Sequence, residues 1–176
     1  MNKRLTKEDY TKDILDLAPH IIGKLLVRRY NDGRVKKYRI NEIEIYNGEE
    51  DTACHARIGK TPRTKTLYKE GGITYIYLCY GIHYLLNIVT GKKDHPEAIL
   101  IRGVEGLSGP GKVSKELKIT KELHEKDLTT SNYLWLEDDS YQAKFIRDKR
   151  IGIDYATKKY REIKWRYILK EGNKNE

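Results

Sequence analysis

The stretch from Glu42 to His55 carries the side chains best suited to chemistry. Its strand-like start alternates Glu42, Glu44 and Tyr46 with apolar residues, a glycine turn follows, and an acidic loop ends at His55. Because alternate residues of a strand point to the same side, two carboxylates and a phenol share one face. With the imidazole in reach, these groups could line one pocket in which a carboxylate acts as a base. The commoner explanation of such a pattern is the solvated face of a sheet.

A second chemical possibility is His55 beside Cys54, as a catalytic dyad or as part of a metal site. Neighbours on an extended chain point apart and no third ligand stands at motif spacing, so we expect neither a dyad nor a metal, and no cofactor. Cys54 and Cys79 are too few and too scattered for a disulfide framework. This cysteine usage predicts a reducing, intracellular compartment.

A β-hairpin is predicted to carry the acidic face. Residues 24–30 and 34–46 are strand-like and flank Asn31-Asp32-Gly33, a sequence typical of tight turns. On the second strand, Ile43 and Ile45 should point away from the carboxylates.

Before this hairpin, Asp13 is expected to cap a short helix over residues 14–22, which Pro19 should interrupt and Gly23 should end. The polar ends of the chain, residues 1–9 and 171–176, are candidates for disorder.

Residues 47–72 show no sustained periodicity and are predicted to form a long loop. Loops of this length in compact domains tend to be functional. The loop is basic, which suits contacts with phosphates, although a run of charges is by default only solvated. Its basic residues are Arg57, Lys60, Arg63, Lys65 and Lys69.

A second hairpin is predicted over residues 73–90, with its bend at Tyr80-Gly81. An aromatic ring at an exposed tip is either a wedge that contacts a partner or an ordinary hairpin cap. Asn87 interrupts an apolar strand, and a buried amide must find hydrogen-bond partners in the protein or in a ligand.

Residues 98–104 form a third predicted strand, in which Arg102 breaks the apolar run. A guanidinium in a core strand needs a carboxylate partner, and Glu44 is the obvious candidate. Gly109-Pro110-Gly111-Lys112 then opens a short helix over residues 113–117, whose start could hold a phosphate. The spacing of a Walker loop is absent.

The last predicted strands are residues 135–136, 150–155 and 161–169. Together these elements predict an α+β fold in which a curved, mainly antiparallel sheet is flanked by short helices. At 176 residues, one domain spanning residues 1–176 is expected.

Composition adds a hint about partners. The chain has 35 basic and 26 acidic side chains and a formal charge of +9. Such an excess favours a polyanion, because phosphates gain both attraction and counterion release, or it reflects lysines on solvated faces. No window approaches the 18 or so apolar residues that a membrane span needs, and we expect no membrane partner.

Six pieces of the sequence, in order, resemble the alkyladenine (3-methyladenine) DNA glycosylase family. Each piece alone is weak evidence, but the six pieces in order are specific for this family. The match covers nearly the whole chain, from about Leu15 to Leu169. The pieces are Glu44-Ile45-Tyr46 with the run to His55-Ala56-Arg57, Thr61-Pro62-Arg63, Tyr75-Ile76-Tyr77-Leu78-Cys79-Tyr80-Gly81, Asn87, Arg102, and Gly109-Pro110-Gly111-Lys112.

The resemblance implies a monofunctional enzyme that flips a damaged purine out of duplex DNA and hydrolyses its N-glycosidic bond. Glu44 matches the general base that activates a water. Glu42 lies on the same face and could also act as a base, and only the resemblance favours Glu44. Arg102 matches the arginine that holds this carboxylate and the water. No lysine nucleophile is required by this scheme, so no lyase step is expected.

The remaining matches concern the base and the DNA. The flipped base would lie between Tyr46 on one side and His55 with Tyr77 on the other, and Asn87 matches the residue that resists guanine. Tyr80, at the tip of a protruding hairpin, matches the side chain that intercalates in the DNA stack.

The resemblance also implies double-stranded DNA with damaged purines as the partner, a monomer, and a location on chromosomal DNA. Arg57, Arg63 and Lys112 are candidates for contacts with the DNA backbone. The damaged bases in question are 3-methyladenine, 7-methylguanine, hypoxanthine and ethenoadenine.

Three features depart from the family pattern. Ile45 stands where alanine is usual, Thr64 and Lys65 stand where Asn-Arg is expected, and residues 103–109 form a shortened segment. A function of a different class also stays open, a non-catalytic module that binds nucleic acid through its basic loop and tyrosines.

Overall fold

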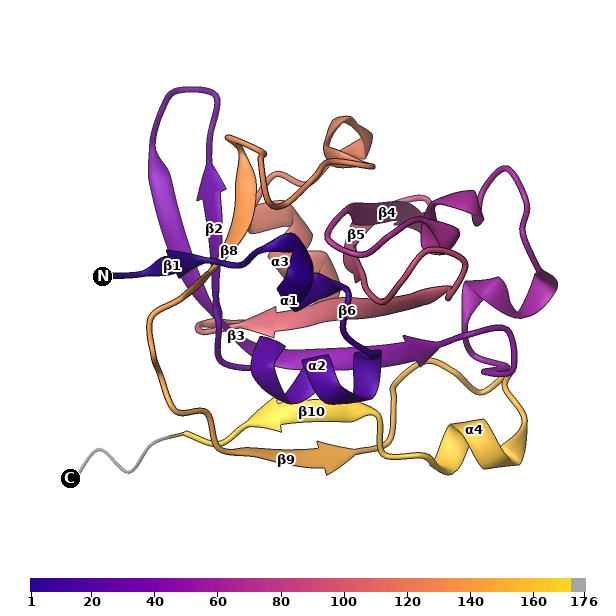
Figure 1. Ribbon diagram of the computed structural model, residues 1–176. Helices are drawn as coiled ribbons and strands as arrows, with labels where there is room; N and C mark the ends of the chain where they lie inside the picture. Colours follow the sequence, from indigo (N-terminus) through magenta and orange to yellow (C-terminus); the bar gives the residue numbers. More distant parts are fainter. Residues whose placement is uncertain (172–176) are drawn as a thin grey trace.

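The computed structural model describes residues 1–171 as an α+β domain built on a large antiparallel sheet (Figure 1). The strands are β1 (Lys3–Arg4), β2 (Leu25–Arg29), β3 (Val35–Asn47), β4 (Thr74–Cys79), β5 (His83–Val89), β6 (Glu97–Val104), β7 (Leu107–Ser108), β8 (Leu134–Asp138), β9 (Phe145–Asp148) and β10 (Arg166–Leu169). The helices are α1 (Lys7–Tyr10), α2 (Ile14–Ile21), α3 (Pro110–Glu116) and α4 (Lys158–Glu162), with 3-10 turns η1 (His55–Ile58), η2 (Lys65–Tyr68) and η3 (Lys121–Leu123). The predicted α+β class with a mainly antiparallel sheet and short helices is confirmed, whereas a DNA-intercalating role of the β4–β5 hairpin stays a prediction.

The long strand β3 organises the sheet. The strand order is β1-β8-β2-β3-β6-β5-β4, and β10 pairs with both β3 and β9. β2 pairs with the first part of β3, whereas β6 and β10 pair with its second part, so the end of β3 has a neighbour on each side. Figure 1 shows β9 and β10 side by side next to β3, and α4 near the end of β3. This arrangement brings the C-terminal part of the chain to the acidic face.

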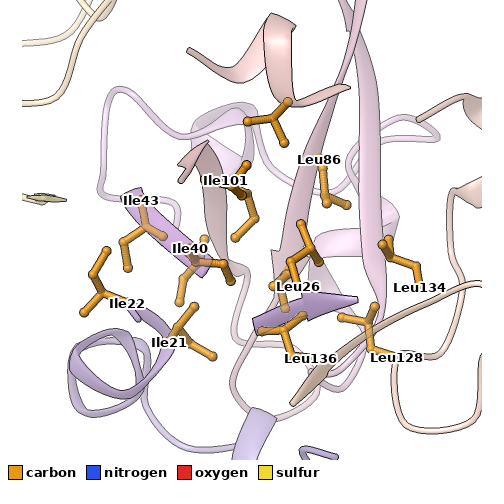
Figure 2. Packing of buried hydrophobic residues seen from close by; sticks show 14 of the residues in the cluster. Ile21, Ile22, Leu26, Ile40, Ile43, Leu86, Ile101, Leu128, Leu134 and Leu136 are labelled. Carbon is orange, nitrogen blue, oxygen red and sulfur yellow. The ribbon is translucent and has the colours of Figure 1, made fainter. Parts of the chain in front are cut away.

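One face of the sheet buries the main hydrophobic core. Aliphatic side chains of α2, β2, β3, β5, β6 and β8 meet there, and each such side chain contributes about 1.5–3 kcal/mol when fully buried. Figure 2 labels Ile21, Ile22, Leu26, Ile40, Ile43, Leu86, Ile101, Leu128, Leu134 and Leu136, all of which are 0–1% exposed. The core fixes β3 and therefore the residues on its other face.

The helix before the first hairpin is confirmed, with one correction. Asp13 caps α2 by accepting the backbone N–H of Leu15 at 2.9 Å, and Gly23 follows the helix at φ +88°. Pro19 does not interrupt the helix as expected. Burial of its apolar face holds the turn around Pro19, and the N–H of Ile22 still reaches the carbonyl of Ala18 at 3.2 Å.

The N-terminal residues, candidates for disorder by their composition, take part in the fold as β1 and α1. Lys3 and Arg4 pair with β8, and the Arg4 guanidinium donates to the carbonyl of Leu128 at 2.8 and 3.0 Å. These contacts offset the polar composition of the segment. At the other end Glu171 is described, and residues 172–176 lie outside the described residues.

Both predicted hairpins are confirmed, as are the strands around residues 98–104 and 135–136. The short helix also forms, although it begins at Pro110 rather than Val113. Two predicted closing strands are wrong. Residues 150–155 form turns, and residues 161–169 divide between the end of α4 and β10.

Within residues 1–171, no helix has the length and apolar character needed to span a membrane.

Candidate active site

Glu44 lies in the second part of β3, at the centre of the sheet. The alternation expected from the sequence is confirmed, because Ile43 and Ile45 are fully buried in the core while Glu42, Glu44 and Tyr46 take the opposite face. That face is not simply solvated, since Glu44 is 0% exposed. A carboxylate is therefore held inside the protein, where it needs partners.

Both carboxylate oxygens of Glu44 accept hydrogen bonds. Oε1 accepts from the Tyr46 hydroxyl at 2.9 Å, and Oε2 accepts from the backbone N–H of Ile151 at 2.6 Å. Burial raises the pKa of Glu44, because desolvation penalises the charged form, while Arg102, these two donors and Arg150 act in the opposite direction. A fixed carboxylate with a raised pKa has the character of a general base.

Arg102 contacts both acidic residues of this face. Its Nε donates to Glu42 Oε1 at 2.9 Å, and its Nη1 lies 3.7 Å from Glu44 Oε1. The expected pairing with Glu44 is thus present as an ion pair, but the hydrogen-bonded partner is Glu42. Arg166 also donates to Glu42, at 3.2 Å. Glu42 is held between two guanidinium groups, which makes it a support for Arg102.

The segment after β9 completes the site, and sequence reasoning missed it. Arg150 and Asp51 form a fully buried, bidentate ion pair, with distances of 2.7 and 2.9 Å. Arg150 also donates to the carbonyl of Ile45 at 2.9 Å, and its guanidinium carbon lies 5.0 Å from the centre of the Tyr46 ring. This anchoring places Ile151 against Glu44. The signal in the sequence was Arg150 directly before Ile151-Gly152-Ile153.

His55, Tyr75 and Tyr77 form an aromatic cluster beside this face. His55 packs edge-on against Tyr77, with ring centres 4.5 Å apart, and its Nδ1 lies 2.8 Å from the Tyr75 hydroxyl. Burial lowers the pKa of His55 to about 4, and Arg63 and Arg57 act in the same direction. His55 is therefore neutral at pH 7. Burial also raises the pKa of Tyr77, so its phenol stays protonated.

Glu44 and the aromatic residues line one common cavity of about 560 Å³. Glu44, Tyr46, His55, Tyr77, Asn87 and Arg102 all line it, together with Tyr75, Tyr80 and Tyr155. The predicted catalytic and base-pocket residues are thus brought together.

Asn87 lies at the buried end of the same cavity and is 3% exposed. Its amide nitrogen donates to the carbonyl of Tyr75 at 3.2 Å and lies 3.5 Å from that of Leu85. Because both amide hydrogens are used by the backbone, the group that Asn87 leaves for a ligand is its carbonyl oxygen.

Tyr80 stands at the tip of the β4–β5 hairpin. It adopts φ +51° and is 92% exposed, and Leu78 and Ile82 beside it are exposed as well. The ring borders the cavity from outside. An exposed apolar tip beside a pocket suits contact with a partner, while intercalation in DNA remains a prediction.

The three candidate residues for the DNA backbone are all exposed. Arg57 lies over the Tyr155 ring at 5.1 Å, and Arg63 lies over the Tyr77 ring at 5.8 Å. Lys112 is on α3, whose first residue Pro110 also lines the cavity. All three therefore lie on elements that border the cavity.

The structure shows where the residues that depart from the family pattern lie. Ile45 points into the core, away from Glu44, as expected. Thr64 is buried and donates to the carbonyl of Gly59 at 2.8 Å, whereas Lys65 is exposed. The shortened 103–109 segment is a tight connection in which β7 pairs directly back onto β6.

Cys54 and His55 have different surroundings. The thiol is buried, and desolvation raises its pKa to about 11, which disfavours the reactive thiolate. The Nδ1 of His55 is directed to Tyr75 instead. Within residues 1–171, no group of three His, Cys, Asp or Glu side chains could hold a metal ion.

Known proteins place the chain in a family. Residues 8–108 and 105–173 match the model of Methylpurine-DNA glycosylase (MPG). A protein of Psychrobacter cryohalolentis is 41% identical over 169 residues, with 80% of each chain covered. Proteins of Natranaerobius thermophilus and Clostridium novyi are 38% and 35% identical, with 96% of each chain covered. All three relatives are provisionally named 3-methyladenine DNA glycosylase. The chain belongs to the methylpurine-DNA glycosylase family.

Proposed function

We propose that this protein is a monofunctional DNA glycosylase of base excision repair, which flips a damaged purine out of duplex DNA and hydrolyses its N-glycosidic bond with a water activated by Glu44. The product is an abasic site. The substrates are 3-methyladenine, 7-methylguanine, hypoxanthine and ethenoadenine in double-stranded DNA. The protein acts as a monomer, inside the cell, on chromosomal DNA.

The observation that carries this proposal is the position of Glu44. A buried carboxylate, held by Tyr46 and by the backbone of Ile151, lines a cavity that several aromatic rings also line. The faces of Tyr46 and Tyr77 suit a flat heterocycle, and they attract a cationic alkylated purine more strongly through the ring quadrupole. The site thus combines a base for water with a slot for a purine.

The charge of the substrate helps the reaction. An alkylated cationic purine is already a good leaving group, so one carboxylate and a water suffice, and general-base help is worth on the order of 10²–10⁴ in rate. A cation in the cavity also favours the ionised form of Glu44, which burial otherwise disfavours. Arg102, 3.7 Å from the carboxylate, acts in the same direction. In this proposal Arg102 also positions the water.

The base must leave the stack to reach Glu44, because duplex DNA hides the reactive carbon. Tyr80 then fills the gap and offsets part of an unstacking cost of a few kcal/mol. Arg57, Arg63 and Lys112 contact phosphates around the opening. Asn87 resists normal guanine through the exocyclic amine of that base, because the buried Asn87 side chain, held by the carbonyl of Tyr75, leaves no space for the extra group.

The second candidate, a non-catalytic module that binds nucleic acid, has less support. A carboxylate close to DNA repels phosphates and would weaken a pure binder. A buried Glu44 that faces a cavity is costly without a reaction to perform.

A glycosylase assay with the purified protein separates the two functions. Duplexes that each contain one of the four damaged bases are incubated with the protein, and released base and abasic sites are measured. Release of any of these bases, without strand cleavage, is the expected result. Binding to all duplexes without base release would support the module instead.

A further inference from the structure

Arg57 and Tyr155 stand together at the rim of the cavity. Tyr155 lines the cavity and is 60% exposed, and Arg57 is exposed beside it. The guanidinium lies close enough to His55, another lining residue, to help lower the pKa of that imidazole. A nucleotide whose base enters the cavity must leave its sugar and phosphates outside, at this rim.

The protein holds the Arg57 side chain at two points. Its Nη1 donates to the carbonyl of Cys54 at 3.0 Å, and its guanidinium carbon lies 5.1 Å from the centre of the Tyr155 ring. The Tyr155 ring is fixed in turn, because its hydroxyl donates to the carbonyl of Ala53 at 2.8 Å. These contacts restrict the rotamers that an exposed arginine otherwise samples.

The protein does not neutralise the charge of Arg57. Among residues 1–171 it has no carboxylate partner, and its Nε and Nη2 donate no hydrogen bond to that part of the chain. Arg39 shows the contrasting case, since it lies over the Tyr141 ring at 4.2 Å while Asp139 accepts from both of its Nη atoms at 2.8 Å. Arg57 therefore keeps its charge and two donor groups for a ligand.

We infer that Tyr155 is a positioning residue that holds Arg57 against its ring, so that the guanidinium binds a phosphate of the flipped nucleotide. A guanidinium fork matches two phosphate oxygens, and charge-assisted hydrogen bonds of this kind are stronger than neutral ones. Because Arg57 is held before the DNA arrives, less conformational entropy is lost on binding. The inference rests on the proposed function and adds the residue that positions this phosphate contact.

The salt dependence of binding counts the phosphate contacts. The ligand is a duplex that contains the 2′-fluoro analogue of the hypoxanthine nucleotide, which resists hydrolysis, and an undamaged duplex of the same sequence is the reference. Each phosphate contact contributes about 0.9 to the slope of log K against log salt concentration. We expect Arg57→Gln to make this slope shallower by about 0.9 on the lesion duplex and the affinity about tenfold weaker, with a much smaller change on the undamaged duplex. An unchanged slope, or equal changes on both duplexes, would overturn the inference.

Two variants of Tyr155 separate the role of the ring from that of its hydroxyl. Tyr155→Leu removes the aromatic face, so the affinity for the lesion duplex should fall about two- to fivefold. Tyr155→Phe keeps that face and should retain most of the affinity, because Arg57 still has a ring to lie against. Equal losses in the two variants would assign the effect to the hydroxyl and overturn the inference.

The double variant tests whether Tyr155 acts through Arg57. With Arg57→Gln already in place, Tyr155→Leu should cause no further loss of affinity, because the cation that the ring holds is absent. A merely structural role of Tyr155 would give the same loss in both backgrounds, which would overturn the inference. Thermal unfolding shows which variants are folded, and Arg57→Gln, at an exposed position, keeps the phosphate contact testable if Tyr155→Leu does not fold.

Tyr141→Leu is the matched control. Tyr141 is 38% exposed and carries Arg39 over its ring, but Asp139 neutralises that arginine and Tyr141 does not line the cavity. Its removal should leave the affinity and the salt slope unchanged. A loss of affinity equal to that of Tyr155→Leu would show that any such ring has the same effect and would overturn the inference.

These measurements of binding are separate from base release. If the protein releases a damaged base while Arg57→Gln keeps the salt slope of the unaltered protein, the inference fails and the proposed function stands. If no damaged base is released from any duplex, the proposed function itself fails.

Discussion

Ile151 donates its backbone N–H to Oε2 of Glu44 at 2.6 Å, across 107 positions of the sequence. The contact fixes one oxygen of the carboxylate and leaves the other to Tyr46 and Arg102. This hydrogen bond forms because the preceding residue, Arg150, is held in place by its bidentate ion pair with Asp51. The orientation of the proposed base therefore depends on a segment outside the strand that carries it.

Loss of the buried ion pair between Arg150 and Asp51 should lower the free energy of unfolding. Asp51→Asn leaves the Arg150 guanidinium buried without its counter-charge, which costs about 3–5 kcal/mol in the free energy of unfolding. Denaturant titration measures the change. Asp148→Asn is the control, because Asp148 pairs with Arg166 at the surface, where such pairs contribute about 0–1 kcal/mol. Similar losses of unfolding free energy in both variants would show that the buried ion pair contributes no more to stability than the surface pair.

Removal of the Arg102 charge should change the pH dependence of excision. Arg102 lowers the pKa of Glu44 against the effect of burial, so Arg102→Gln should raise that pKa further. Single-turnover rates should fall, and the acidic limb of the pH–rate profile should move to higher pH. Arg166→Gln is the control, since Arg166 contacts Glu42 and Asp148. An acidic limb that stays in place in Arg102→Gln would contradict the assignment.

Truncation of the hairpin tip should affect duplex DNA in particular. Tyr80→Ala should lower single-turnover excision from duplex by about 10- to 100-fold, because the flipped state loses a contact that offsets a few kcal/mol of unstacking. Excision from single-stranded DNA should change little. Tyr133→Ala removes another exposed tyrosine, which lies outside the site. Unchanged duplex rates in Tyr80→Ala would count against a wedge.

A buried carboxyl outside the site should make stability depend on pH. Burial, with help from Asp13, raises the pKa of Glu97 to about 7. The folded protein then binds a proton that the unfolded chain releases, so stability falls as the pH rises from about 4.5 to about 7. Glu97→Gln should remove this loss and gain up to about 3 kcal/mol at pH 8, since the pKa rises from 4.5 to about 7 and each pKa unit corresponds to about 1.4 kcal/mol. Thermal unfolding of both proteins at pH 5 and pH 8 measures it, and a gain of equal size at pH 5 would contradict this origin.

Local patterns predicted the elements that carry most of the site. The alternation of Ile43 and Ile45 with Glu44 fixed the face of β3, and Tyr80-Gly81 marked the bend of a hairpin. These features depend on neighbours in the sequence, and strand geometry determines them.

Features that depend on distant residues were missed or misassigned. Residues 150–155 have the apolar pattern of a short strand, but the pairing of Arg150 with Asp51 turns them into a loop around the cavity. Arg102 hydrogen-bonds Glu42 rather than Glu44 because the bulge that shifts the pairing of β3 with β6 falls next to Glu42. Periodicity contains no information about such contacts.

The Glu44→Gln variant tests whether Glu44 is the catalytic base. Glutamine keeps the size of the side chain and most of its hydrogen bonds but cannot take a proton from water. Single-turnover release of hypoxanthine and of 3-methyladenine from duplex DNA is measured beside the affinity for the same duplexes. We predict that base release is abolished while the affinity is retained. Excision by Glu44→Gln at the rate of the unaltered protein would contradict it.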